Sequence, residues 1–502
     1  MPRSRRLCLL TNAPQSAFAV NLGILYPRRV TVLDTTTQPH GPEVLKPYGA
    51  VVTMVTHRAA LASLDYDAVR AYAASGGTVV SCLAEYARPL GLGVTKSLVL
   101  DGGQRPAVRI RECSDVTAGF APGDEVLWFG KVSGATYNDC NPNQYYQRQI
   151  MGLEGRPGVT ILGISSLNGG AVLAEERVGR GRIVAMDLLS LKEPFYDSWG
   201  STNKYLFLGN AIGRSVRYGK HYARKLPYDD LLEHMRDLAA RQPTLTFAEE
   251  GPVSDGRPLG SLSVGNPEAP GFLFTNGIHG WEWESGYGLL HLAELLAADK
   301  LPEGLSRDDF HVRLIPQLNP YGYDHDVRHN ANGVDLNRNF DCGWAEYTGG
   351  DDVYQPWDFD YKGPYPGSEP ESQLVMRLIR EMQPMCLLDF HTAHYLFCKP
   401  HRGDRRLMNA IHTEVKRRLP DRYLLQRPYS TEYCQVNMER EVDWLKPTPH
   451  LIHWAAEAGV AAPILIEMSG NRSLTQALVM NTDTTIEICL AAIKQCLKRA
   501  RK

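Results

Sequence analysis

Residues 277–287 read GIHGWEWESGY and follow an apolar run at 272–274. His279 and Glu282 stand three positions apart in this stretch, at what has the pattern of a helix start. Residues at i and i+3 share a helix face, so the imidazole and the carboxylate are expected to converge on one cation. Two histidines and one glutamate suit Zn2+ and leave a coordination position open for water. Glu284 is a poorer ligand candidate, because five residues after His279 it points about 140° away around a helix.

The His-x-x-Glu motif alone is a weak signal, because chains of this length show matches by accident. An ordinary helix start with a surface carboxylate near its positive end is the alternative. Residues 319–341, NPYGYDHDVRHNANGVDLNRNFD, supply further context. Asn-Pro and Tyr-Gly mark a turn there, and Arg328 precedes a polar loop. The segment 334–340 then alternates like a short strand or the exit from one.

Together these two segments resemble the zinc carboxypeptidases, the M14 metallopeptidases. GIHGWEW is similar to the family's GIHSREW, and Arg-x-Asn followed by GVDLNRNFD is similar to its regulatory-type form. A histidine at a strand end is the family's third element, and His391 in CLLDFHT (386–392) supplies it. A glutamate closing a late apolar strand is the fourth, and Glu467 in PILIEMS (463–469) supplies that. Four motifs in the family's order make an accidental match improbable.

The resemblance implies one Zn2+ per chain, held by His279, Glu282 and His391. It also implies that Asp335 accepts a hydrogen bond from His279, which would fix the tautomer of that ligand. His394 is a rival third ligand, but the family's Ile/Leu-His-Ser/Thr pattern falls on His391. A buried core histidine and an ordinary turn aspartate are the alternatives for His391 and Asp335.

The same resemblance implies roles in substrate binding and proton transfer. Glu467 would be the general base, since a carboxylate that ends an apolar strand is costly to bury without a function. Asn337 and Arg338 would grip the terminal carboxylate of the substrate through an amide and a guanidinium fork. Arg328 would polarise the scissile carbonyl and stabilise the oxyanion. The alternative for Arg328 and Arg338 is that they form surface salt bridges. The alternative for Glu467 is a glutamate at a strand end that faces solvent.

Some positions depart from the family pattern. Trp281 stands where digestive members place a substrate-binding arginine. The family's mobile tyrosine should follow an Asp-Trp pair, but no tyrosine follows 443–444, and Tyr433 precedes it. These departures remove the family's contacts at the positions of Trp281 and the mobile tyrosine. The sequence Asp-Phe-His-Thr at 389–392 also resembles the corresponding motif of the succinylglutamate desuccinylase and aspartoacylase branch, which cleaves acylated amino acids.

Composition is that of an ordinary soluble globular protein, with 502 residues, 43% hydrophobic and 22% charged. The 54 basic residues nearly balance the 56 acidic ones, which argues against nucleic acid as the main partner. The sequence has no apolar run of about 18 residues, so no membrane segment is expected, and the apolar run at 7–10 is shorter than a signal peptide would need. Ten scattered cysteines without paired spacing favour reduced thiols and a cytoplasmic location.

Two domains are expected, both of the α/β class. Residues 222–500 would form the catalytic domain, a mixed sheet with helices on both faces as in the zinc carboxypeptidases. Residues 1–215 would form a flavodoxin-like accessory domain, because short apolar strands alternate there with helices and are followed by a hairpin at 171–187. This region loosely resembles class I glutamine amidotransferase-like domains, including ThuA-type relatives. Cys82 follows a strand where that fold keeps its nucleophile, but it lacks the flanking glycines of a sharp elbow, so an inert buried thiol is expected.

The leading hypothesis is a zinc-dependent metallocarboxypeptidase-like hydrolase that acts on peptides. Zinc would acidify a water molecule, and Glu467 would take its proton and return it to the leaving amine. An N-acyl amino-acid deacylase or amidase is the first alternative, and a binding protein with a vestigial site is the second. A glutamine-dependent amidotransferase working through Cys82 is the third.

Overall fold

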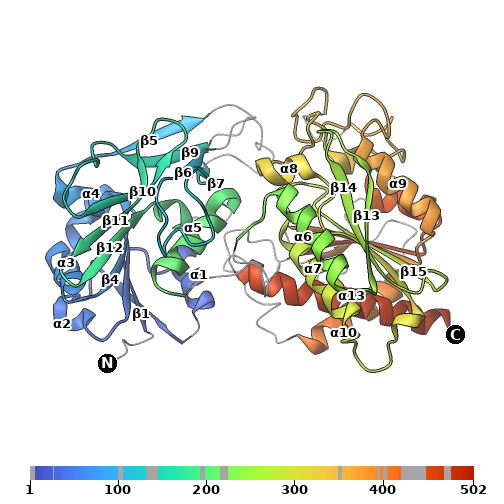
Figure 1. Cartoon of the computed structure of the whole chain (residues 1–502), viewed down its shortest axis with the longest axis horizontal. Helices are drawn as coiled ribbons and strands as arrows, with labels where there is room; N and C mark the ends of the chain where they lie inside the picture. The colour runs from blue at the N-terminus through green and yellow to red at the C-terminus, as the bar shows by residue number, and fades with distance from the viewer. Residues whose placement is uncertain are drawn as a thin grey trace. The chain divides into compact units, whose positions relative to one another are not determined.

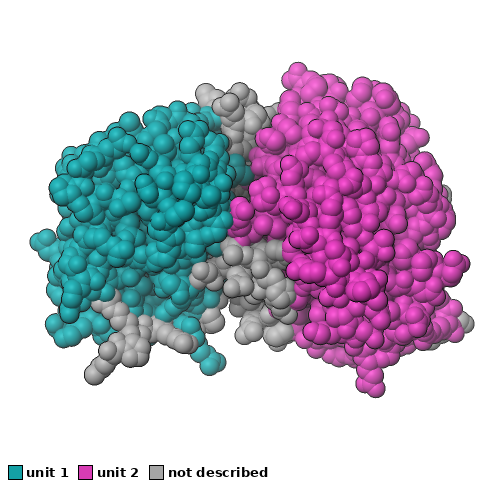
Figure 2. All heavy atoms as spheres, viewed as in Figure 1, with its two compact units in different colours: residues 1–217, 472–476 teal, residues 218–471, 477–502 magenta. Residues whose placement is uncertain are grey.

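The computed structural model describes residues 6–26, 28–99, 106–131, 145–192, 198–214, 224–348, 353–392, 396–398, 404–419, 448–468 and 476–501. The chain divides into two compact units (Figure 2). The first comprises Met1–Arg217 with Arg472–Gln476, and the second comprises Tyr218–Asn471 with Ala477–Lys502. Among the described residues, no helix combines the length and apolar character needed to cross a membrane.

The first unit is built on a single mixed sheet with helices around it. Its strands are β1 (Leu7–Thr11), β2 (Val30–Asp34), β3 (Ala50–Met54), β4 (Thr78–Cys82), β5 (Val94–Val99), β6 (Ala107–Ile110), β7 (Glu125–Leu127), β8 (Gly130–Lys131), β9 (Tyr145–Ile150), β10 (Val159–Ser165), β11 (Ala171–Val178) and β12 (Gly181–Met186). Its helices are α1 (Ala17–Leu25), α2 (Pro42–Leu45), α3 (Tyr66–Ala74), α4 (Leu83–Ala87) and α5 (Ser198–Ala211), with 3-10 turns η1 (Arg58–Ser63), η2 (Arg88–Leu90) and η3 (Leu189–Lys192).

Part of this sheet is parallel, as the alternation of apolar runs and helices predicts. Strands β2, β1, β3, β4 and β12 lie side by side in that order, and each neighbouring pair is parallel. Beyond β12 the sheet continues with antiparallel pairs, beginning with the predicted hairpin β11–β12. Alternate residues of β1 face opposite layers: Leu7 and Leu9 pack with α1 and α5, whereas Cys8 and Leu10 pack with α3 and α4. Burial on both faces explains why these strands are nearly continuous apolar runs.

The second unit contains its own mixed sheet. Its strands are β13 (Leu245–Pro252), β14 (Pro258–Gly265), β15 (Gly271–Asn276), β16 (His311–Ile315), β17 (Cys386–Thr392), β18 (Leu396–Cys398) and β19 (Ala462–Met468). Its helices are α6 (Tyr228–Arg241), α7 (Glu284–Ala297), α8 (Pro320–His325), α9 (Pro370–Met382), α10 (Arg405–Arg418), α12 (Leu451–Glu457) and α13 (Gln476–Ala500), with 3-10 turns η4 (Arg307–Asp309) and η5 (Leu336–Arg338).

The centre of this second sheet is parallel. Strand order is β13-β14-β16-β15-β17-β19-β18, and the neighbours β16, β15, β17 and β19 all run the same way. Helices α9 and α12 pack against one face, where Leu273, Leu387 and Leu465 point. Helices α6 and α7 lie on the other side of the sheet from α9 (Figure 1). The predicted mixed α/β sheet with helices on both faces is therefore confirmed.

Two local predictions were wrong. Helix α7 begins at Glu284, so His279 and Glu282 precede the helix and do not share a helix face. The segment 334–340 is not a strand, because residues Leu336–Arg338 form the 3-10 turn η5. Asp335 caps that turn by accepting a hydrogen bond from the backbone N–H of Asn337 (2.9 Å), and this local bond competes with an extended conformation.

Candidate active site

The predicted functional residues gather at the carboxyl ends of neighbouring parallel strands. His279 and Glu282 follow β15, whereas His391 lies near the end of β17 and Glu467 near the end of β19. The carboxyl ends of adjacent parallel strands meet at one edge of a sheet, which is where ligands bind in open α/β folds. Residues separated by nearly two hundred positions are therefore brought together by topology.

A tight turn, not a helix, brings His279 to Glu282. The backbone N–H of Glu282 donates to the carbonyl oxygen of His279 (2.9 Å), which closes the turn. Gly280 is required at its centre, since a Cβ atom there would overlap the backbone of Gly322. The indole of Trp281 donates a hydrogen bond to Oε1 of Glu282 (3.3 Å), which leaves Oε2 to face the two histidines.

Three ligand-type atoms converge on one point. Oε2 of Glu282 lies 3.1 Å from Nδ1 of His279 and 3.0 Å from Nδ1 of His391. All the ligand atoms of this buried group fall within 4.8 Å of one another. Zinc bonds of ~2.0–2.1 Å in a tetrahedral site separate neighbouring ligand atoms by about 3.3 Å. The donor set and its spacing therefore fit Zn2+.

Each histidine is held from behind by a buried carboxylate. Nε2 of His279 lies 3.2 Å from Oδ1 of Asp335, and Nε2 of His391 lies 2.9 Å from Oδ2 of Asp389. Such contacts place the proton on Nε2 and leave Nδ1 free to bind a metal. Burial lowers the pKa of His391, but the carboxylates of Asp389 and Glu282 outweigh it and hold the pKa well above its usual range. A metal cation in this cluster would replace that proton on Nδ1.

Arg328 is buried beside the first ligand. Its Nε and Nη2 atoms bond to Oδ2 of Asp335 at 2.9 and 2.6 Å, so the guanidinium is held in a fixed orientation. The remaining nitrogen, Nη1, lies 3.2 Å from Nδ1 of His279, on the side that faces the metal-ligand cluster. Burial raises the pKa of Asp335, but Arg328 and Arg338 outweigh it and hold the pKa well below its usual range.

Asn337 and Arg338, the pair predicted to bind the terminal carboxylate of the substrate, already have hydrogen-bond partners within the chain. Nη2 of Arg338 forms an ion pair with Asp360 (2.9 Å), and its Nε donates to the hydroxyl of Tyr347 (2.7 Å). Its Nη1 lies 2.9 Å from Nε2 of His450. Burial and the positive charge of Arg338 hold the pKa of His450 well below its usual range, so this ring is neutral and accepts the bond. The side-chain oxygen of Asn337 accepts from the backbone N–H of Leu451 (3.0 Å).

Sequence reasoning missed four residues of this site. Trp281 was noted only as a departure from the family pattern, and Asp389 only as part of a family-like wording. Asp360 and His450 carried no signal, because they reach Arg338 from distant loops. The rival ligand His394, Tyr433 and the pair at 443–444 lie outside the described residues.

A profile of the family described as zinc carboxypeptidase matches residues 231–490, just over half of the 502-residue chain. The chain belongs to the zinc carboxypeptidase family. The predicted zinc cofactor is confirmed at this level, since the family is zinc-dependent by description and a His-Glu-His group that could hold a metal is present. The match lies within the expected catalytic domain, whereas the amidotransferase-like resemblance of residues 1–215 stays a prediction, as does the cytoplasmic location.

Several known proteins are similar to parts of the chain. Murein peptide amidase A of Escherichia coli (strain K12) is 42% identical over 82 residues, which cover 15% of this chain and 33% of that protein. Carboxypeptidase SOL1 of Arabidopsis thaliana is 28% identical over 164 residues, covering 31% and 30%, respectively. Carboxypeptidase B of Canis lupus familiaris is 26% identical over 237 residues, covering 41% and 54%. The chain thus spans from about a third to about half of the length of these relatives.

Among solved structures, carboxypeptidase A from Helicoverpa armigera superimposes with a TM-score of 0.47 at 18% identity, covering 55% of this chain and 75% of that one. Murein-tripeptide amidase from Escherichia coli O157 gives a TM-score of 0.29 at 25% identity, with coverages of 44% and 83%.

Proposed function

We propose that this member of the zinc carboxypeptidase family is a hydrolase that cleaves the amide bond next to a C-terminal amino acid with a free carboxylate. One observation carries the proposal. His279, Glu282 and His391 present a zinc-type donor set at the carboxyl ends of parallel strands, and Glu467 pairs with His391 in the neighbouring strand. When bound, Zn2+ supplies a Lewis acid that acidifies water and polarises a carbonyl group.

The residues of the chain then have distinct tasks. Glu467 takes a proton from the attacking water and returns it to the leaving nitrogen, as a general base and then a general acid. Arg328 offers its Nη1 to the oxygen that becomes negative, while Asp335 holds the guanidinium in place. Asp335 and Asp389 keep the two histidines in the tautomer that presents Nδ1 to the metal.

Asn337 and Arg338 are proposed to receive the terminal carboxylate of the substrate. Arg338 is buried beside Asp360, so a substrate carboxylate would share or replace an existing ion pair. Binding therefore exchanges one charge-assisted contact for another instead of creating one from solvent. The requirement for a free carboxylate is directly measurable by comparing a substrate with its amide.

A second candidate is a peptide amidase or N-acyl amino-acid deacylase that uses the same metal group and the same base. The 42% identity over 82 residues with murein peptide amidase A favours it, because the name of that relative states an amidase activity on a peptide. In this case the occupied Arg338–Asp360 pair would shape the pocket without binding a terminal carboxylate. Mass spectrometry of the products from zinc-loaded protein incubated with peptides, amidated peptides and N-acyl amino acids separates the two candidates.

Residues 1–215 are proposed to be an accessory domain without a catalytic role. Cys82 is only 2% exposed, and burial together with the neighbouring Glu85 raises the pKa of its thiol well above the usual range. A nucleophilic cysteine needs the opposite, namely a lowered pKa and access to substrate. The amidotransferase alternative therefore finds no support in this cysteine. A vestigial binding protein is disfavoured because all of the proposed ligands and the base are retained.

A further inference from the structure

A pocket in the first unit has no part in the proposed hydrolysis. It has a volume of about 630 Å3. Its walls come from Val55 and His57 after β3, Ala84 in α4 after β4, and Leu189 after β12. These positions lie beyond the carboxyl ends of parallel strands, the edge at which open α/β sheets bind ligands. Cys82 is not among the residues that line it.

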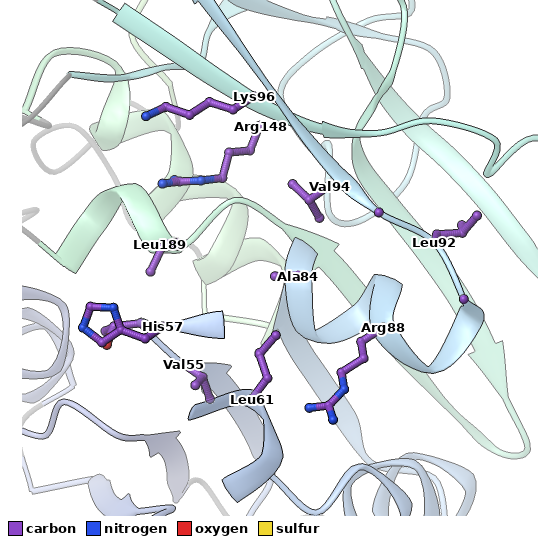
Figure 3. Close-up of a pocket in the computed structure, with 13 residues that line it drawn as sticks. Val55, His57, Leu61, Ala84, Arg88, Leu92, Val94, Lys96, Arg148 and Leu189 are labelled. Atoms are coloured by element: carbon purple, nitrogen blue, oxygen red, sulfur yellow. The ribbon is translucent and has the colours of Figure 1, made fainter. Parts of the chain in front are cut away.

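Two cations stand side by side on one wall of the pocket. Lys96 of β5 and Arg148 of β9 are directly opposite each other in the antiparallel register of these strands. Figure 3 shows both side chains extending in the same direction. The ring centre of Tyr146 lies 4.2 Å from Nζ of Lys96 and 4.5 Å from the guanidinium carbon of Arg148. Like charges directly opposite each other destabilise a strand pair, and the ring of Tyr146 and the carboxylate of Asp187 offset part of that cost.

Two cations near the pocket share one carboxylate. Asp187 pairs with Arg148 (3.3 Å), but the buried Lys204 also lies 3.7 Å from the same carboxylate. Arg88 adds a third cation, and Figure 3 places its guanidinium on the opposite side of the pocket from Lys96 and Arg148. None of the described residues that line the pocket is acidic. A site of this kind attracts anions.

The remaining lining residues are largely apolar. Val55, Leu61, Val94 and Leu189 supply aliphatic surface between the cationic groups. Small-molecule sites have this construction, with apolar walls for most of the ligand and a few polar groups that fix its orientation. The volume also falls in the range of ~300–1,000 Å3 that is usual for such sites.

We propose that the first unit binds a small molecule with an apolar body and an anionic group, a carboxylate or a phosphate. The anion lies between Lys96 and Arg148, and the apolar body contacts Val55, Leu61 and Leu189. This site is independent of the proposed peptidase activity, since every residue that it uses belongs to the first unit.

The test is a titration of the full-length chain followed by saturation-transfer NMR. Phenyl phosphate and phenylacetate serve as the two anionic probes, and benzyl alcohol is the neutral probe of similar size. Lys96→Met is the informative variant, because Lys96 is exposed and its replacement leaves the Arg148–Asp187 pair intact. Lys46→Met is the matched control, a lysine of the same unit whose side chain is 75% exposed and lies outside the pocket.

We expect at least one anion to bind more tightly than benzyl alcohol, and Lys96→Met to raise its Kd by about tenfold or more, the loss of one charge-assisted contact. Lys46→Met should leave the Kd unchanged. The comparison of the two anions tells a phosphate site from a carboxylate site. Binding of an anion at the metal centre would be unaffected by Lys96→Met, so an unchanged Kd in that variant overturns the proposal. Failure of both anions to bind, or binding of benzyl alcohol with equal affinity, also overturns it.

Discussion

Glu467 stands directly opposite His391 in the parallel pairing of β19 and β17. Side chains alternate along a strand, so residues paired across neighbouring strands project from the same face of the sheet. The proposed base and a proposed metal ligand are thus fixed side by side by backbone hydrogen bonds. A shift of one residue in this register would turn Glu467 to the opposite face.

The purified protein should contain one zinc ion per chain, and a chelator should remove it. His279→Ala and His391→Ala should each lose most of the metal, because two remaining ligands hold zinc poorly. Elemental analysis by mass spectrometry measures the metal content. His325→Ala is the control, an exposed histidine of the same unit outside the cluster. Full zinc occupancy in His391→Ala would show that His391 is not the third ligand and would favour His394 in that role.

Asp389→Asn should weaken zinc binding while leaving all three ligands in place. The carboxylate of Asp389 is fully buried, contacts His391 through Oδ2 and accepts from the hydroxyl of Thr275 through Oδ1 (2.9 Å). Removal of such a carboxylate typically costs ~10- to 100-fold in metal affinity. Competition with a chromogenic chelator measures the affinity. Thr275→Val, which removes only the outer hydrogen bond, should have a smaller effect, and an unchanged affinity in Asp389→Asn would refute this positioning role.

A substrate with a free terminal carboxylate should be preferred over its amide. Loss of the contact to Arg338 should lower kcat/KM by at most the equivalent of about 1.5–3 kcal/mol, because the existing pair with Asp360 offsets part of the loss. Asp360→Asn should widen the preference, because it removes the carboxylate that already pairs with Arg338. Steady-state kinetics on one peptide, prepared with a C-terminal carboxylate and with a C-terminal amide, measures the ratio of the two kcat/KM values. Equal cleavage of the acid and the amide would exclude binding of the terminal carboxylate by Asn337 and Arg338. It would favour the second candidate, a peptide amidase.

Alkylation of the native protein should not inactivate it through Cys82. Among the described cysteines, Cys113 is exposed and should react first, whereas the buried thiol of Cys82 has a raised pKa and little thiolate at neutral pH. Peptide mapping after brief treatment with iodoacetamide identifies the modified residues. Loss of hydrolysis in proportion to Cys82 modification would instead support an amidotransferase-type role for the first unit.

Much of the fold could be predicted because its signals are local. The apolar runs at 7–10, 30–33 and 51–55 become β1, β2 and β3, and the hairpin expected at 171–187 is formed by β11 and β12. His279, Glu282, His391 and Glu467 were found through motifs whose residues are close in sequence. Topology then placed these motifs at one edge of the sheet.

The contacts around Arg338 could not be predicted because its partners lie far from it in the sequence or in a loop without a pattern. His450 is 112 positions away from it, and Asp360 lies in a long loop without periodic patterning. Such partners depend on how loops pack after the sheet has formed. The error at His279 and Glu282 has a similar origin: i, i+3 spacing suits a helix, but the hydrogen bond from Glu282 to His279 produces the same proximity in a turn.

The most direct test of the proposed mechanism is the turnover of zinc-loaded Glu467→Gln. Glutamine has nearly the same shape as glutamate, and Glu467 is not one of the proposed zinc ligands. Zinc content and Tm should therefore match those of the wild type. An amide cannot accept the proton of the attacking water, and general-base action is typically worth ~10² to 10⁴ in rate. Glu457→Gln, a change at an exposed carboxylate at the end of α12, is the control. The account predicts a fall of that size in kcat with little change in substrate binding, whereas near-normal turnover of Glu467→Gln would contradict it.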